Sequence, residues 1–186
     1  MSLNRLTQFS QRMAALTLLF IVGMLALNAA LWIFPTLGAN DGLGAGFSLS
    51  GVMFSQHAVR VELLAWWQIF GAILISSVPL LALASGLNNL RRLFLGYARG
   101  EYFSISAAVH LGKVGRGVIL WVISSFICTP LLSILVTLHA PPGQRFFTVS
   151  FTSADFVALF LAGCIAVIAR ILLRASEVDS ENRTFV

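Results

Sequence analysis

Four long runs of apolar residues alternate along the chain with shorter polar segments. The runs cover about residues 13–34, 63–87, 117–138 and 154–173. Each is close to the length of about 20 apolar residues that an α-helix needs to cross the hydrocarbon of a bilayer. The first run exceeds the apolar stretch of about 7–15 residues that a cleaved signal peptide contains. The pattern therefore predicts an all-α integral membrane protein, with residues 1–186 forming a single membrane domain built as a four-transmembrane-helix bundle.

The segment between the second and third runs, residues 88–116, is here called the elbow. Apolar residues recur in it at helical spacing from Leu90 to Tyr97, so we expect the second helix to continue beyond the bilayer as an amphipathic helix. Gly100 is expected to end that helix, because glycine readily adopts the left-handed conformation that closes many helices. Ser104 or Ser106 then caps a second helical piece that leads into the third run. The elbow is thus predicted to be a helical hairpin at the membrane surface.

The two connectors on the opposite side, residues 36–62 and 139–153, contain short segments in which apolar and polar residues alternate. Residues 47–55 alternate in part, and residues 145–151 place apolar side chains at every second position. Alternation of this kind is typical of β-strands. The pattern therefore predicts a small two-stranded β cap outside the bilayer.

The distribution of charge predicts the orientation of the helices. The chain is 58% hydrophobic and only 10% charged, whereas an ordinary soluble domain carries about 25% charged residues. Of the twelve Lys and Arg residues, only Arg60 and Arg145 lie in the connectors 36–62 and 139–153. Nine lie at the termini or in the elbow, and the tenth on that side, Arg170, lies one turn before the end of the fourth run. Because cytoplasmic segments of membrane proteins carry the excess of Lys and Arg, we expect both termini and the elbow in the cytoplasm.

The net charge of +5 does not predict direct binding of nucleic acid, because the basic residues flank the apolar runs instead of forming one face. Basic residues in these positions are instead expected to contact the anionic headgroups of the lipid bilayer. The residues concerned are Arg91, Arg92, Lys113, Arg116, Arg170 and Arg174.

The sequence predicts no enzyme, no metal site and no cofactor. Glu101 and His110 of the elbow could act together in acid–base catalysis, but no nucleophile or substrate pocket accompanies them. Cys128 and Cys164 lie within apolar runs and are expected to be free thiols. No pair of Cys or His has the spacing of metal ligands.

Three short motifs resemble the bacterial family known as domain of unknown function 2975. They are residues 90–94, the turn Arg99-Gly100-Glu101-x-Phe103-Ser104, and a tail with Glu177, Glu181-Asn182 and Thr184-x-Val186. The resemblance covers about residues 83–186 and does not match the long first connector. It implies a small protein of the bacterial inner membrane with four spans and no catalytic residues. Because family members often lie beside the gene for a small Cro-like DNA-binding protein, it also implies a regulatory pairing with such a protein.

Two functions of different classes follow. The first is a non-enzymatic regulatory or interaction protein whose elbow and tail contact a soluble partner, with Arg99, Gly100, Glu101, Phe103 and Ser104 as candidate contacts. The alternative is a small transporter or channel subunit with a site near Pro79 and Pro130, which interrupt the second and third runs. No Asp, Glu, Lys or His lies in the middle of any run, and such residues usually mark ion or proton pathways. Either function is compatible with a homo-oligomer.

Overall fold

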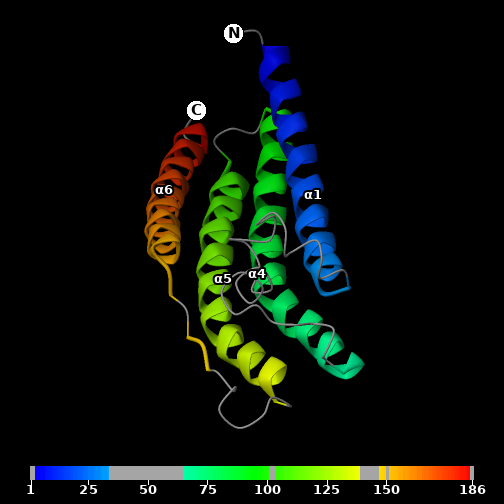
Figure 1. Cartoon of the computed structure of the whole chain (residues 1–186). Coiled ribbons are helices and arrows are strands. Elements are labelled where there is room, and N and C mark those ends of the chain that lie inside the picture. Colours follow the sequence, from blue (N-terminus) through cyan, green and yellow to red (C-terminus); the bar gives the residue numbers. More distant parts are fainter. Residues whose placement is uncertain (1–2, 34–64, 101–103, 139–146, 150, 185–186) are drawn as a thin grey trace. The chain divides into compact units, whose positions relative to one another are not determined.

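Four long α-helices account for most of the described chain (Figure 1). The computed structural model describes residues 3–33, 65–100, 104–138, 147–149 and 151–184, with side chains from residue 7 to residue 177 of these ranges. The helices are α1 (Leu3–Ile33), α4 (Trp66–Ala98), α5 (Ile105–Thr137) and α6 (Ser153–Thr184). All four are long and apolar enough to cross a membrane. The prediction of an all-α bundle of four spans is therefore confirmed.

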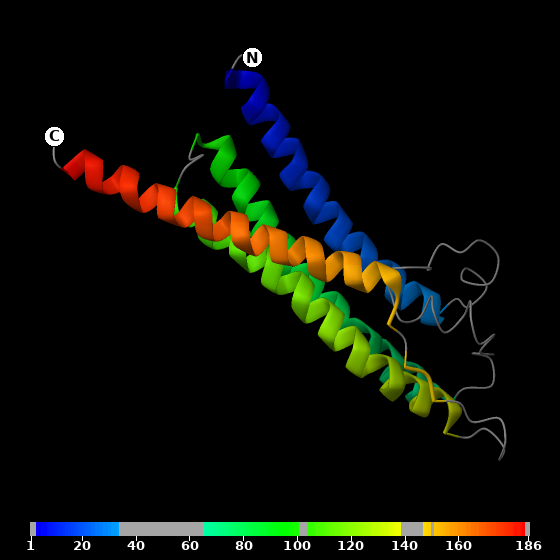
Figure 2. The same ribbon diagram turned by 90° about the vertical axis from the view of Figure 1, so that its left-hand side faces the viewer.

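Each helix is longer than the apolar run that predicts it. The helices contain 31, 33, 33 and 32 residues, which corresponds to lengths of about 46 to 50 Å, whereas the hydrocarbon of a bilayer is about 30 Å thick. The excess is about three turns per helix and lies at the end that carries the basic residues. These charged turns are residues 3–12, 88–98, 105–116 and 174–184. Figure 2 shows α6 as one uninterrupted helix that includes its charged turns.

The chain divides into two compact units. Unit 1 consists of Met1–Ile21, Leu83–Ile119 and Ser153–Val186, and unit 2 consists of Val22–Ala82 and Leu120–Thr152. The charged turns of all four helices belong to unit 1. The described residues of unit 2 contain no Asp, Glu, Lys, Arg or His. Charge is therefore separated between the two units as far as the structure describes them.

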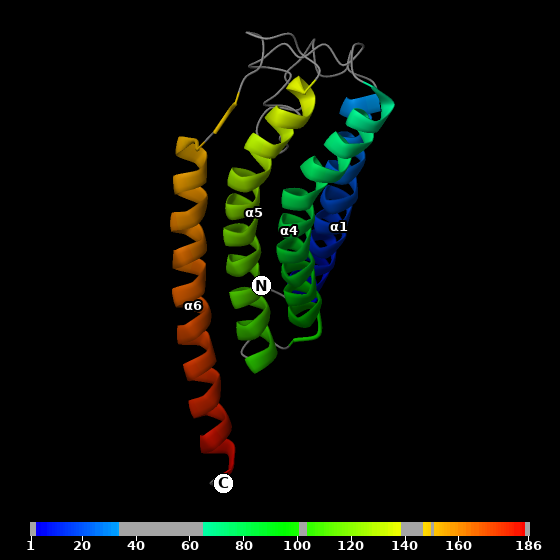
Figure 3. The same cartoon turned by 90° about the horizontal axis from the view of Figure 1, so that it is seen from below.

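Glycine residues hold α5 against both of its neighbours in unit 1. A Cβ atom added to Gly86 of α4 would lie 3.2 Å from the Cα of Gly117 in α5. A Cβ added to Gly115 would lie 3.0 Å from the backbone oxygen of Ala162 in α6. Figure 3 shows α5 beside α4 in this unit, with α6 running next to α5. Membrane helices often pack in this way. In lipid the hydrophobic effect does not drive helices together, so small residues that let the backbones approach closely favour association.

Helix α6 packs through a narrow seam. Its buried residues are Ala162, Ala169 and Ser176, which recur at intervals of seven and so lie on one line along the helix. The opposite faces carry large exposed apolar side chains such as Phe160, which is 71% exposed. Only 11% of the apolar window of α6 is buried, against 28% in each of the other three helices. Of the four helices, α6 therefore has the least contact with the rest of the protein.

Unit 2 contains a core of apolar side chains from three helices. Trp32 of α1 and Ala72 of α4 pack with three buried residues of α5, which are Cys128, Leu132 and Val136. Around them lie the partly buried side chains of Ile69, Ile73, Ile75 and Leu135. Both Cys128 and Cys164 are free thiols, as the sequence predicts.

The described residues contain no strand, so the predicted β cap is not observed there. Residues 47–55, the first predicted strand, lie outside the described residues. In the second, the backbone N–H of Thr148 donates to Ser133 Oγ of α5 at 3.3 Å, and Phe151 meets Phe126 edge to face with 6.2 Å between ring centroids. Thr148 and Phe151 therefore contact α5, whereas the apolar side chains of Phe147 and Val149 are exposed.

We expect that adding one methyl group at Gly115 destabilises the protein. Gly115→Ala should lower the free energy of unfolding by about 1–3 kcal/mol, because the Ala162 backbone cannot give way as a flexible side chain could. The matched control is Gly163→Ala, since a Cβ at Gly163 meets nothing within 4 Å. Unfolding in mixed micelles with increasing dodecyl sulfate, followed by circular dichroism, measures both variants. Equal stability of the two variants would contradict the close approach of α5 and α6.

Candidate functional site

The turn at the tip of the elbow is built as the sequence predicts. Helix α4 ends at Ala98, and Gly100 follows with a φ of +85°. The N–H of Arg99 donates to the carbonyl of Gly96 at 2.9 Å, and the N–H of Gly100 donates to the carbonyl of Tyr97 at 3.1 Å. These bonds satisfy carbonyl groups that the helix end would otherwise leave without partners. A positive φ strains any residue with a Cβ, which explains glycine at this position.

Ser104 caps the helix that leaves the elbow. The N–H of Ala107 donates to Ser104 Oγ at 3.1 Å, and α5 begins at the next residue, Ile105. This is the bond by which an N-cap serine satisfies a free donor in the first helical turn. Of the two predicted caps, Ser104 is thus the one observed, and Ser106 lies within α5. The predicted contacts Glu101 and Phe103 lie outside the described residues.

A polar contact joins the two helices of the elbow. His110 Nδ1–H of α5 donates to Asn89 Oδ1 of α4 at 3.1 Å, and Asn89 Nδ2 donates to the carbonyl of Ser85 at 2.8 Å. Asn89 was not singled out by the sequence. Its position at the end of the second apolar run, one turn after a serine, is the only signal that could have indicated it. His110 therefore links the two helices of the hairpin, and Glu101, with which acid–base catalysis was considered, lies outside the described residues.

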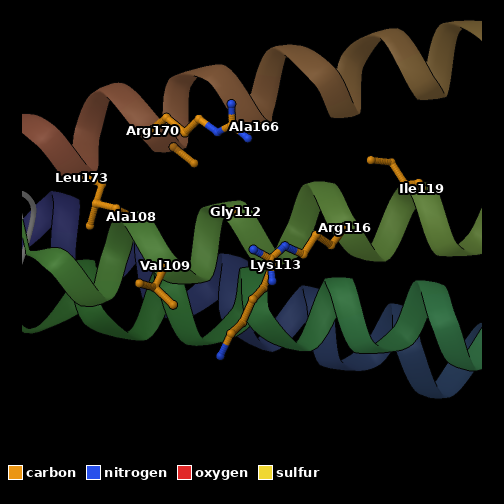
Figure 4. A pocket seen from close by; sticks show the side chains of 10 residues that line it. Ala108, Val109, Gly112, Lys113, Arg116, Ile119, Ala166, Arg170 and Leu173 are labelled. Atoms are coloured by element: carbon orange, nitrogen blue, oxygen red, sulfur yellow. The ribbon is translucent and has the colours of Figure 1, made fainter.

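Three of the predicted lipid-facing cations line one cavity in unit 1. The cavity lies between α5 and α6 and has a volume of about 230 Å³. Lys113 and Arg116 contribute from α5 and Arg170 from α6, as Figure 4 shows. Every other residue lining it is apolar or glycine, and no Asp or Glu is among them. The other three predicted cations, Arg91, Arg92 and Arg174, do not line it. The sequence indicates the cations but not the small residues Gly112, Ala166 and Ala169 that leave the space between them.

Unit 2 contains a buried network of hydrogen bonds between α1 and α4. Asn28 Nδ2 donates to Ser76 Oγ at 3.1 Å and lies 3.3 Å from Ser77 Oγ. Trp32 Nε1 also donates to Ser76 Oγ, at 3.2 Å. Asn28, Trp32 and Ser76 are each at most 1% exposed. Ser76 Oγ therefore accepts two buried donors from the neighbouring helix.

Gln68 makes the corresponding link between α4 and α5. Its Nε2 donates to the carbonyl of Leu135 at 2.9 Å, and its Oε1 accepts the N–H of Ala65 at 3.0 Å. Polar groups at membrane depth have no water available, so such pairing is what helix packing in lipid requires. The Gln68 side chain thus caps the start of α4 and fastens it to α5.

The prolines that suggest a transport site both lie inside uninterrupted helices. Pro79 is fully buried in α4 and Pro130 is half-buried in α5. Hydroxyl groups near them bond to backbone: Ser77 Oγ donates to the Ile73 carbonyl at 2.6 Å and Ser133 Oγ to the Pro130 carbonyl at 2.8 Å. These contacts are ordinary in membrane bundles. No observation among the described residues favours the transport alternative over a packing role.

The conformation of Gly100 predicts a graded response to substitution. Gly100→Ala should lower the free energy of unfolding by about 1 kcal/mol, because a Cβ is disfavoured at positive φ. Gly100→Asn should cost less, since asparagine enters the left-handed region more readily. Nothing lies within 4 Å of the added Cβ, so crowding does not complicate the comparison. Detergent-micelle unfolding of the two variants measures the difference, and an alanine variant as stable as the asparagine variant would contradict this account.

The adjacent serines of α4 provide a matched pair for the network in unit 2. Ser76→Ala removes the acceptor of two buried donors and should lower the free energy of unfolding by about 1–2 kcal/mol. Ser77→Ala removes one longer contact and should cost about 0.6 kcal/mol or less. Both variants also lose a hydroxyl that donates to the Ile73 carbonyl, at 3.2 Å from Ser76 and 2.6 Å from Ser77, so the greater cost expected at Ser76 comes from its contacts with α1. Equal costs would show that Ser76 is not the centre of the network.

Comparison with known proteins extends the resemblance seen in the sequence. The chain matches the family described as Protein of unknown function (DUF2975) over residues 4–186. The match includes the first helix and the first connector as well as the second half in which the motifs occur. No curated protein and no solved structure matches the chain. The protein, with its four span-length helices, therefore belongs to the DUF2975 family.

Proposed function

We propose that this protein is a non-enzymatic protein of the bacterial inner membrane whose elbow and α6 tail contact a soluble cytoplasmic partner. Its four span-length helices make it a multi-pass membrane protein. Both termini and the elbow are proposed to face the cytoplasm, because ten of the twelve Lys and Arg residues lie on that side of the four runs.

The observation that carries the proposal is the length of the helices at their charged ends. A helix that only spans the hydrocarbon needs about 20 residues, yet each helix continues for about three further turns. All of these charged turns belong to the same compact unit. Membrane insertion does not require them, so they are available to form a helical surface outside the bilayer.

The charge of this surface indicates what kind of partner it fits. Arg99, at the elbow tip, and Arg174, in the charged turns of α6, are both exposed. The elbow carries five Lys and Arg residues against one acidic residue, Glu101, whereas residues 174–184 are mixed in sign, with two Arg against Glu177, Asp179 and Glu181. A cationic surface such as that of the elbow selects partners that present a complementary acidic patch. We therefore propose an acidic protein surface as the contact. A small DNA-binding regulator, the partner that the family resemblance implies, would have to bind through a face other than its basic DNA-binding face.

Site-directed photocrosslinking in native membranes tests this proposal. A photoreactive phenylalanine analogue in place of Arg99 or of Arg174 should form an adduct with a soluble protein, because both positions lie on the proposed contact surface. The same analogue in place of Phe160, which is 71% exposed on α6, should give adducts with lipid only. Mass spectrometry of the adducts identifies the partner.

Two results would overturn the proposal. One is adducts with lipid alone at all three positions. The other is an adduct with a protein of the opposite compartment, which would reverse the proposed orientation.

A further inference from the structure

The cavity between α5 and α6 is lined by basic and apolar residues, and it is a site distinct from the proposed contact with a soluble partner. We propose that it binds the phosphate-bearing headgroup of an anionic glycerophospholipid, with Arg116 and Arg170 as the residues that recognise the phosphate and Lys113 at the edge of the site. The inference does not depend on the proposed function, because it concerns a lipid site within one compact unit of the chain.

The lining of the cavity indicates an anion. Three cations from two helices line one space, and no acidic residue lines it to neutralise them. Two of the three are arginines, whose planar guanidinium groups bind phosphate oxygens through paired hydrogen bonds. Figure 4 shows Arg116 on α5 and Arg170 on α6, whereas the end of the Lys113 side chain is directed away from α6. A bound phosphate group would therefore bridge α5 and α6.

The depth of the cavity favours a lipid over free phosphate. Arg116 directly precedes the third apolar run, which begins at Gly117, and Arg170 lies one turn before the end of the fourth. Cations at the ends of apolar runs lie at the level of the headgroups. The lining on the membrane side of the cations is apolar, with Ile119 on α5 and Ala166 on α6, and so is the lining at the other end, with Ala108, Val109 and Leu173. A phospholipid places its phosphate among the cations and its acyl chains along the apolar lining on the membrane side.

Small side chains keep the space open. The volume of about 230 Å³ is several times the roughly 30 Å³ that one water molecule occupies in the liquid. A Cβ at Gly112 would meet only the Cβ of Ala169, at an ordinary distance of 3.7 Å. One helical turn toward the membrane, the contact of Gly115 with Ala162 fixes the spacing of the two helices. A larger residue at Gly112 would therefore fill the cavity without forcing the backbones apart.

Native mass spectrometry of the purified full chain, titrated with phosphatidylglycerol in detergent, tests the site. The wild type should retain phosphatidylglycerol and bind phosphatidylcholine much more weakly. Arg116→Gln combined with Arg170→Gln should weaken phosphatidylglycerol binding about thirtyfold, since each cation contributes about fivefold near an anionic group. Gly112→Val, which leaves the charge unchanged, should also weaken binding by filling the cavity.

The matched control removes the same charge elsewhere in unit 1. Arg12→Gln combined with Arg92→Gln, at two exposed positions that do not line the cavity, should leave binding within about twofold of wild type. Equal loss in both double variants would show a general charge effect and overturn the proposal, as would equal binding of phosphatidylcholine. Displacement of the lipid by inorganic phosphate would assign the site to a free anion instead. If the arginine double variant does not fold by circular dichroism, unchanged binding in Gly112→Val alone overturns the lipid site.

Discussion

The contact of backbone with backbone along α5 is the constraint on which unit 1 depends. Gly115 lets α6 approach on one side, and Gly117 meets Gly86 of α4 on the other. A side chain at either place would separate the helices by the width of a methyl group. That separation would weaken the bond between His110 and Asn89 across the elbow. It would also move the cations of α5 away from Arg170. Both the hairpin and the basic cavity therefore depend on glycine, which has no Cβ atom, at these helix contacts.

The helices of the two units are held together by different interactions. Lipid is as apolar as a leucine side chain, so burial of apolar surface gives membrane helices little reason to associate. In unit 1, small residues allow close packing of the helices along α5. In unit 2, the helices are joined by hydrogen bonds from Asn28, Trp32 and Gln68 and by an apolar core that includes Leu132. In the described residues the charged groups belong to unit 1, where the helix ends can reach water and headgroups.

Local signals in the sequence predicted the spans and the elbow, and non-local features were missed. The roles of Gly100 and Ser104 depend on backbone conformation within a few residues, so pattern alone indicates them. The helices of the elbow were predicted, but the charged turns at residues 3–12 and 174–184 were assigned to polar termini because hydropathy falls there, although Arg, Lys and Glu are good helix formers. Alternation in residues 145–151 predicted a strand, but the pattern does not specify what the segment contacts. The cavity depends on which faces of α5 and α6 pack against each other. The sequence of either helix alone does not specify that pairing.

Helix α6 is the element through which these features can influence one another. It has the smallest buried share of the four helices and is held by a seam of small residues. Its charged turns carry Arg174, on the proposed partner surface, and Arg170 lines the cavity one turn away. A ligand that bridges α5 and α6 stabilises the docked position of α6, and so does any partner that contacts only that position. Since coupling between two binding events is reciprocal, each ligand would then raise the affinity of the other by the same factor. The weakly packed fourth helix thereby gives a physical route by which lipid composition could alter contact with a soluble protein.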